Sequence, residues 1–135
     1  MQVFIVEDHD MVRHMLSRWV KRASGLNLCG EAQSAEEALQ HIPERHPDLL
    51  LVDISLPQAN GIELIGMLQA QYPDLLILAL SGHDESIYAV PALRAGAQGY
   101  LMKGDVDKLG EAIKQIRSGG IYASEAVRAL LEKPD

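Results

Sequence analysis

Short runs of consecutive apolar residues alternate in this chain with longer segments in which apolar residues recur every three to four positions. Such runs are typical of strands buried on both faces, and the longer spacing is typical of helices with one buried face. We expect strands near 2–6, 27–31, 49–53, 75–80 and 99–102, and helices near 10–23, 35–46, 61–71, 85–95 and 106–118. This alternation predicts an α/β fold, a three-layer sandwich with helices on both faces of a parallel sheet.

The residues that follow four of the predicted strands could act on a phosphoryl group. VFIV runs into Glu7 and Asp8, LLLV into Asp53, LLILAL into Ser81 and GYLM into Lys103. Open α/β sheets bind their ligands outside the carboxyl ends of their strands, so we expect these side chains to meet in one crevice. Carboxylates are the ligands by which proteins usually hold Mg²⁺ next to a phosphate. The pattern predicts a magnesium site in which one of Glu7 and Asp8 binds directly and the other through water.

Lys103 and Ser81 are candidates for binding the oxygens of that phosphate. The Lys103 ammonium would neutralise phosphate charge, and the Ser81 hydroxyl would donate a hydrogen bond to the same oxygens. Gly82 leaves room for the group to enter. Serine and glycine are also common turn residues, so this pair alone is a weak signal.

Composition and charge narrow the class of protein. The chain has 135 residues, which fits one domain, and its 12 basic and 19 acidic residues give a net charge of −7. This charge disfavours a nucleic-acid backbone or an anionic membrane as a direct partner. No apolar run approaches 18 residues, so we expect a cytoplasmic protein without membrane contact. The single cysteine, Cys29, is expected to pack as a small hydrophobe.

The helix expected near 10–23 has one apolar face, which we assign to the core. Its apolar positions are Met11, Val12, Met15, Leu16, Trp19 and Val20, whereas Arg13 and Ser17 fall on the polar side. Met67 and Met102 are interpreted as core residues as well.

Four segments, taken in order, make the chain resemble the receiver domain of a two-component response regulator. They are VFIVEDH, LLLVDISLPQANGIEL, LALSGHDE and ALRAGAQGYLMKG. The last of them, together with RSGGIYASEAV, is most similar to LuxR/NarL-type receivers, which precede a helix-turn-helix domain. The resemblance covers residues 2–125 and implies a flavodoxin-like sheet with strand order 2-1-3-4-5. We expect a receiver domain at 1–120, then a tail or the start of a linker at 121–135.

The resemblance implies a role for each residue of the predicted metal site. Asp53 would be the phosphoacceptor, whose carboxylate attacks the phosphohistidine of a sensor histidine kinase. Asp8, Asp53 and the backbone carbonyl of Ser55 would hold Mg²⁺, and Glu7 would act through water. Glutamate stands at position 7 where aspartate is common, and we expect metal binding to survive this difference.

The resemblance also implies a switch that responds to phosphorylation. Ser81 and Lys103 would bind the phosphoryl oxygens, and Ser81 and Tyr100 would move inward together. The movement repacks the face formed by 85–95, 99–102 and 106–118. The protein would catalyse only its own phosphorylation and dephosphorylation, and would contact DNA only through an output domain absent from this chain. The resemblance is also compatible with a homodimer.

Pro91 is the main departure from the expected pattern. In a helix over 85–95 it would lie past the first turn, where proline removes a backbone hydrogen bond at a cost of about 3 kcal/mol. We therefore expect this helix either to begin later, near Pro91, or to be kinked, and we hypothesise that it is altered or mobile in the resting protein. After Gly120 the sequence SEAVRALLEK forms only a short helix-like tail, too short for a DNA-binding domain.

The histidines do not have the spacing of a zinc site, and a site of oxygen ligands does not favour imidazole. They are His9, His14, His41, His46 and His83. His83 is a partial exception, because it is two residues from Ser81 and would border the phosphoryl pocket.

Two other function classes stay open. A pseudo-receiver would keep the fold as an interaction module without being phosphorylated, and the full set of strand-end residues argues against it. A haloacid-dehalogenase-type phosphohydrolase also uses an aspartate after a buried strand. That class needs a second aspartate two residues on, where this chain has Ser55.

Overall fold

Five strands and six α-helices alternate along the chain in the computed structural model, which describes residues 1–55, 61–82 and 85–132. The strands are β1 (Gln2–Val6), β2 (Asn27–Ala32), β3 (Leu49–Asp53), β4 (Leu76–Ser81) and β5 (Gly99–Met102). The helices are α1 (Asp10–Arg22), α2 (Ala35–Arg45), α3 (Gly61–Gln71), α4 (Glu85–Ala95), α5 (Leu109–Arg117) and α6 (Glu125–Leu131). A 3₁₀ helix, η1 (Lys103–Lys108), joins β5 to α5.

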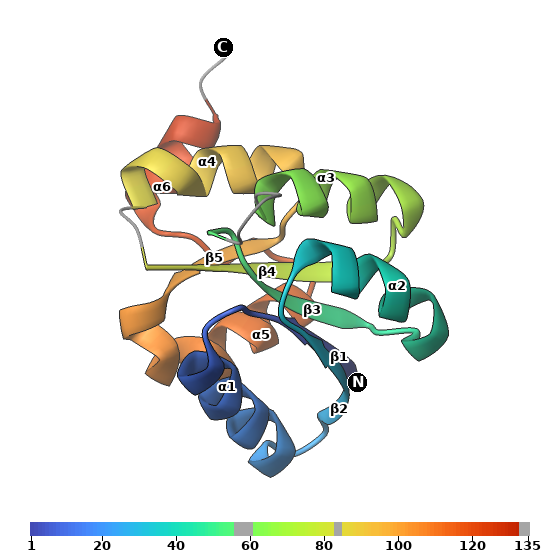
Figure 1. Cartoon of the computed structure of the whole chain (residues 1–135). Helices are drawn as coiled ribbons and strands as arrows, with labels where there is room; N and C mark the ends of the chain where they lie inside the picture. Colours follow the sequence, from blue (N-terminus) through green and yellow to red (C-terminus); the bar gives the residue numbers. More distant parts are fainter. Residues whose placement is uncertain (56–60, 83–84, 133–135) are drawn as a thin grey trace.

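The strands form one parallel sheet in the order β2-β1-β3-β4-β5, which confirms the predicted fold and strand order. Helices α1 and α5 cover one face of the sheet, and α2, α3 and α4 cover the other (Figure 1). Because all strands are parallel, their carboxyl ends lie at one edge. The residues at the carboxyl ends of β1, β3, β4 and β5, or directly after them, therefore lie at this edge.

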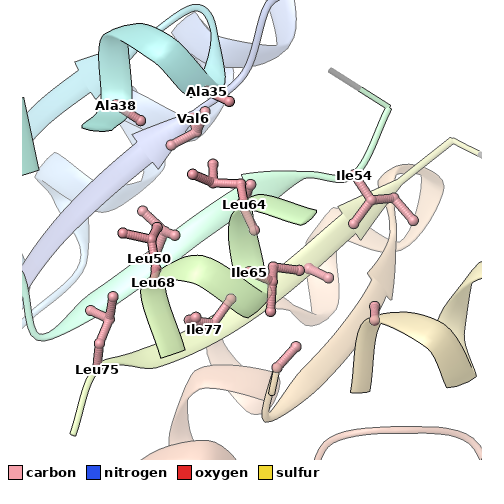
Figure 2. Close-up of a cluster of buried hydrophobic side chains, with 14 of the residues drawn as sticks. Val6, Ala35, Ala38, Leu50, Ile54, Leu64, Ile65, Leu68, Leu75 and Ile77 are labelled. Atoms are coloured by element: carbon pink, nitrogen blue, oxygen red, sulfur yellow. The ribbon is translucent and has the colours of Figure 1, made fainter. Parts of the chain in front are cut away.

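Each face of the sheet has its own apolar core, because successive side chains of a strand point to opposite faces. Val3, Ile5 and Leu51 pack with α1 and α5. Phe4 and Leu50 belong to the other core, with α2, α3 and α4. Figure 2 shows part of this second core, in which side chains of α3 gather over β3 and β4. Cys29 is half-buried against it, as predicted for a small hydrophobe.

The exposure of three methionine side chains contradicts the sequence interpretation. Met11 is 76% exposed, Met15 40% and Met67 49%. In α1 the sheet covers only a narrow stripe, and this stripe includes Ser17, which was assigned to the polar side and is buried. Met102 is half-buried against the core, as predicted.

Helix α4 begins at Glu85 and runs through Pro91 to Ala95, so the prediction of a later start was wrong. The hydrogen bond that Pro91 cannot make would go to the carbonyl of Ile87. Pro91 and Ile87 are both exposed, so water can bind that carbonyl. The expected kink and the mobility of α4 stay predictions.

Helix α5 begins at Leu109 rather than near 106, because η1 takes up the preceding residues.

Residues 121–132 pack on the domain. Tyr122 forms a parallel bridge with Gly99 at the outer edge of β5, where the N–H of Tyr100 donates to the Tyr122 carbonyl at 3.0 Å. Helix α6 lies beside α4 (Figure 1), and its Val127 is buried in the same core as Tyr100. The domain boundary expected at residue 120 stays a prediction.

Within the described ranges, the chain forms no helix of the length and apolar character that crossing a membrane requires.

We predict that Val127→Ala destabilises the domain, because it removes buried apolar volume between α6 and α4. The free energy of unfolding should fall by about 1–2 kcal/mol in urea denaturation. Leu130→Ala in the same helix is the control, since Leu130 is an exposed side chain. Equal losses in the two variants would show that α6 is not docked as the structure has it.

Candidate functional site

An acidic cluster lies at the carboxyl edge of the sheet. Asp53 is the last residue of β3, and Glu7 and Asp8 follow β1, its neighbour in the sheet. Glu7 and Asp53 are buried, whereas Asp8 is exposed. Each of the three residues offers one carboxylate oxygen, and these oxygens lie within 4.8 Å of one another. The sequence analysis grouped the same three residues, and the cluster could hold a metal ion.

Lys103 lies between the two buried carboxylates. Its Nζ is 2.9 Å from Oε1 of Glu7 and 3.2 Å from Oδ2 of Asp53, and its side chain is 23% exposed. Apart from this ion pair, Oε1 of Glu7 has no polar partner among the residues that the structure describes. The ammonium thus compensates the negative charge of both carboxylates.

Burial and neighbouring charges shift the pKa values of two groups in this cluster. Burial raises the pKa of Glu7 above its ordinary value, although hydrogen bonds from Lys103 and from the N–H of His9 act in the opposite direction. Burial by itself would lower the pKa of Lys103. The hydrogen bond to Glu7 and the charge of Asp53 outweigh this effect, so the pKa of Lys103 is raised. The lysine is therefore positively charged at neutral pH.

Arg13 holds the loop that carries the acidic pair, a role that the sequence analysis missed. Its Nη1 donates to the backbone carbonyl of Glu7 at 3.0 Å, and its Nη2 donates to Oδ1 of Asp10 at 2.6 Å. In the same loop the N–H of His9 donates to Oε2 of Glu7 at 3.0 Å. The Arg13 side chain is only 15% exposed. The i, i+3 spacing of Asp10 and Arg13 in the first turn of α1 is the sequence signal that could have indicated their ion pair.

The backbone around Asp53 is also closely held. The N–H of Ser55 donates to Oδ1 of Asp53 at 2.9 Å, and the N–H of Gly61 donates to the Ile54 carbonyl at 3.1 Å. A side chain at position 61 would overlap the backbone of Asp53 and Ile54, which explains the glycine at the start of α3. The Ser55 carbonyl as a metal ligand stays a prediction.

Ser81 and Tyr100, the predicted switch residues, are both buried and lie on adjacent strands. The Tyr100 side chain belongs to the core that includes Ala92 of α4. Gly82, beside Ser81, is exposed, and among the described residues other than its chain neighbours no atom would lie within 4 Å of a Cβ at this position. That Gly82 leaves room for a phosphoryl group to enter stays a prediction. His83 lies outside the described residues.

Comparison with known proteins supports the resemblance to response-regulator receiver domains. A model of the response regulator receiver domain matches residues 3–114. The chain is 35% identical over 122 residues to the transcriptional regulatory protein DegU of Brevibacillus brevis, covering 90% of this chain and 52% of DegU. It is 36% identical over 135 residues to the DNA-binding transcriptional activator DevR/DosR of Mycobacterium tuberculosis, covering 98% of this chain and 62% of that protein. The chain thus spans little more than half the length of these relatives.

A solved structure of similar length supports the assignment. The crystal structure of a LuxR-family two-component response regulator from Aurantimonas sp. SI85-9A1 superposes with a TM-score of 0.87 at 31% identity. The match covers 96% of this chain and 94% of that one. The resemblance drawn from four sequence segments is therefore confirmed, and the chain belongs to the receiver-domain family of two-component response regulators, with LuxR/NarL-type members among its relatives.

Proposed function

We propose that Asp53 accepts a phosphoryl group from the phosphohistidine of a sensor histidine kinase. A carboxylate oxygen of Asp53 attacks phosphorus, the P–N bond breaks, and the imidazole leaves with the bonding electron pair and takes up a proton. The product is an acyl phosphate on Asp53. The observation that carries this proposal is the placement of a buried carboxylate at a strand end, with Lys103 at 3.2 Å and two further carboxylates beside it.

The composition of the cluster fits Mg²⁺ as the cofactor. Glu7, Asp8 and Asp53 supply three negative charges and Lys103 one positive charge, so a divalent cation balances the remainder. All candidate ligands are oxygens, as Mg²⁺ prefers. We assign Asp8, Asp53 and the Ser55 carbonyl as direct ligands, and Glu7 as a ligand through water. When bound, Mg²⁺ would neutralise charge on the phosphoryl oxygens.

Lys103 and Ser81 complete the phosphoryl site. The Lys103 ammonium already lies against Asp53, so it can form an ion pair with an oxygen of the phosphoryl group added there. Ser81 ends β4 beside β3, and its hydroxyl would donate to a second oxygen. The proposed switch couples Ser81 to Tyr100 and changes the packing of α4, β5 and α5. The output, controlled through this face, would be transcription, with DNA bound by a separate domain of the full-length regulator.

Phosphorylation of the intact chain by acetyl phosphate tests the assignment of Asp53. With Mg²⁺, mass spectrometry should show one added phosphoryl group, which Asp53→Ala and removal of Mg²⁺ with EDTA each abolish. Asp74→Asn, a change at an exposed carboxylate near the start of β4 and thus at the opposite edge of the sheet, should leave it unchanged. Absence of any modification would indicate a binding-only module, and rapid multiple turnover would indicate a phosphohydrolase.

Removal of the lysine should destabilise the protein in a pH-dependent way. Lys103→Met leaves Glu7 and Asp53 buried without their cation, so the free energy of unfolding at pH 7.5 should fall by about 1–3 kcal/mol. The pKa of Glu7 is raised, so lowering the pH protonates Glu7 more readily in the folded than in the unfolded state. The stability that Lys103→Met removes should therefore be smaller at pH 5 than at pH 7.5. Urea denaturation at both pH values measures this loss of stability, and Lys114→Met, at an exposed lysine, is the control. An equal loss at the two pH values would contradict the charge argument.

Arg13→Met should weaken Mg²⁺ binding, because it frees the backbone carbonyl of Glu7 and loosens the loop that positions Asp8. We expect a loss of about tenfold in affinity, by analogy with outer-shell substitutions in metal sites. Isothermal titration calorimetry with Mg²⁺ provides the measurement. Arg18→Met removes an exposed arginine from the same helix and is the control. An unchanged affinity in Arg13→Met would show that the loop keeps its shape without the arginine.

A further inference from the structure

A cavity of about 420 Å³ lies at the amino edge of the sheet, at the opposite end of the strands from the acidic cluster. Because the strands are parallel, the helices that connect them run back to this edge, and α2 and α3 both end there (Figure 1). The cavity is lined by residues of the segments 42–48 and 71–75, which join these helices to β3 and β4. Its volume is in the range of sites that hold a small organic molecule.

The buried part of the lining is apolar. The side chains of Ile42 and Leu75 are only 2% and 4% exposed, and Tyr72 is half-buried against the same core. Pro47 and Pro73 follow the two helix ends and restrict the backbone of the walls, so the cavity keeps its shape without a ligand. A ligand in this cavity would therefore cover apolar side chains and one aromatic ring.

The exposed part of the lining is negative. Its carboxylates are those of Asp48 and Asp74, and no lysine or arginine lines the cavity. The carboxyl ends of α2 and α3 add partial negative charge. Arg45, in the last turn of α2, donates to the Cys29 carbonyl of β2 at 3.2 Å. Asp48 uses Oδ2 to accept from the N–H of Gln2 at 2.7 Å, and among the described residues the Asp74 carboxylate has no hydrogen-bond or ion-pair partner.

A metal ion does not fit this lining. His46, Asp48 and Asp74 are the residues of the cavity whose side chains could bind one. Within the described part of the chain, only the acidic cluster at the other edge of the sheet brings three such ligand atoms within 4.8 Å of one another. A ligand that uses both aspartates must therefore be larger than an ion and must carry several hydrogen-bond donors.

We propose that this cavity binds a small organic cation, a guanidinium group on an apolar body. The planar guanidinium carries several N–H donors and binds carboxylates through two parallel hydrogen bonds, so it can reach Asp48, Asp74 and the carbonyls at the helix ends. The apolar body would lie on Ile42 and Leu75. The face of an aromatic ring also attracts cations, and Tyr72 supplies such a ring. The negative rim would repel an anionic ligand.

Phenylguanidine is the probe, because it joins a guanidinium group to a flat apolar ring. Phenylurea has nearly the same shape without the charge, and methylguanidine has the charge without the ring. The isotope-labelled full chain is titrated with each compound at pH 7.5, and its amide NMR signals are followed. We expect phenylguanidine to shift the signals of residues 42–48 and 71–76 saturably and to bind at least about tenfold more tightly than either of the others.

Variants test which side chains hold the cation. Asp48→Asn and Asp74→Asn should each weaken phenylguanidine binding about fivefold, since each removes one negative charge from the rim. Asparagine at position 48 can still accept from the N–H of Gln2, so the fold does not depend on that charge. Asp107→Asn is the matched control, because it removes an exposed carboxylate from η1, which follows β5 at the other edge of the sheet. Circular dichroism checks that each variant is folded.

Four outcomes would overturn the proposal. The first is no saturable shift with phenylguanidine, and the second is equal affinity for phenylurea. The third is a set of shifts centred on the acidic cluster around Asp53, or unchanged binding in both Asp48→Asn and Asp74→Asn. The fourth is tighter binding of a tripeptide with a central arginine, which would make the ligand a side chain of another protein. None of these results depends on the phosphorylation of Asp53.

Discussion

Two carboxylates buried at adjacent strand ends need a positive charge, and Lys103 supplies it. Burying Glu7 or Asp53 without a cation would cost several kcal/mol, and the Lys103 ammonium lies 2.9 Å from one and 3.2 Å from the other. The lysine follows β5, the edge strand, whereas Glu7 follows β1 and Asp53 ends β3, in the middle of the sheet. The site therefore depends on β5 staying in place, and the pairing of Tyr122 with its outer edge helps to hold it there.

The sequence was sufficient to predict this arrangement because the signals involved are local. A run such as LLLVD is apolar on both faces and ends in a carboxylate, so it specifies a buried strand and a polar strand end together. The parallel topology then brings the strand ends to one edge of the sheet. The sequence pattern groups Glu7, Asp8, Asp53 and Lys103 in this way, and the structure places them together.

The predictions that failed concern how far a side chain reaches and how much of a helix its neighbours cover. Helical periodicity placed Arg13 on the outer side of α1, but its long side chain reaches back to the carbonyl of Glu7. The same periodicity identified an apolar face that includes Met15 without showing how much of that face the sheet covers. At Pro91, propensity predicted either a later helix start or a kink; the later start was wrong, and the exposed position of the proline lowers the cost that this argument assumed. Such outcomes follow from packing between elements, which a single sequence does not encode locally.

The same sheet edge connects the site to the C-terminal segment. The side chain of Tyr100 is buried in the core that also holds Val127 of α6 and Ala92 of α4, while its backbone N–H is bound by the Tyr122 carbonyl. Nε2 of Gln115 in α5 and the guanidinium of Arg128 in α6 both donate to the Ile121 carbonyl, so this segment is tied to both neighbouring helices. Interiors as closely packed as these transmit displacements rather than absorb them. A change in the packing of Tyr100 would therefore alter the surroundings of α4 and α6 together, and residues 121–132 are mechanically part of the face that the proposed switch would repack.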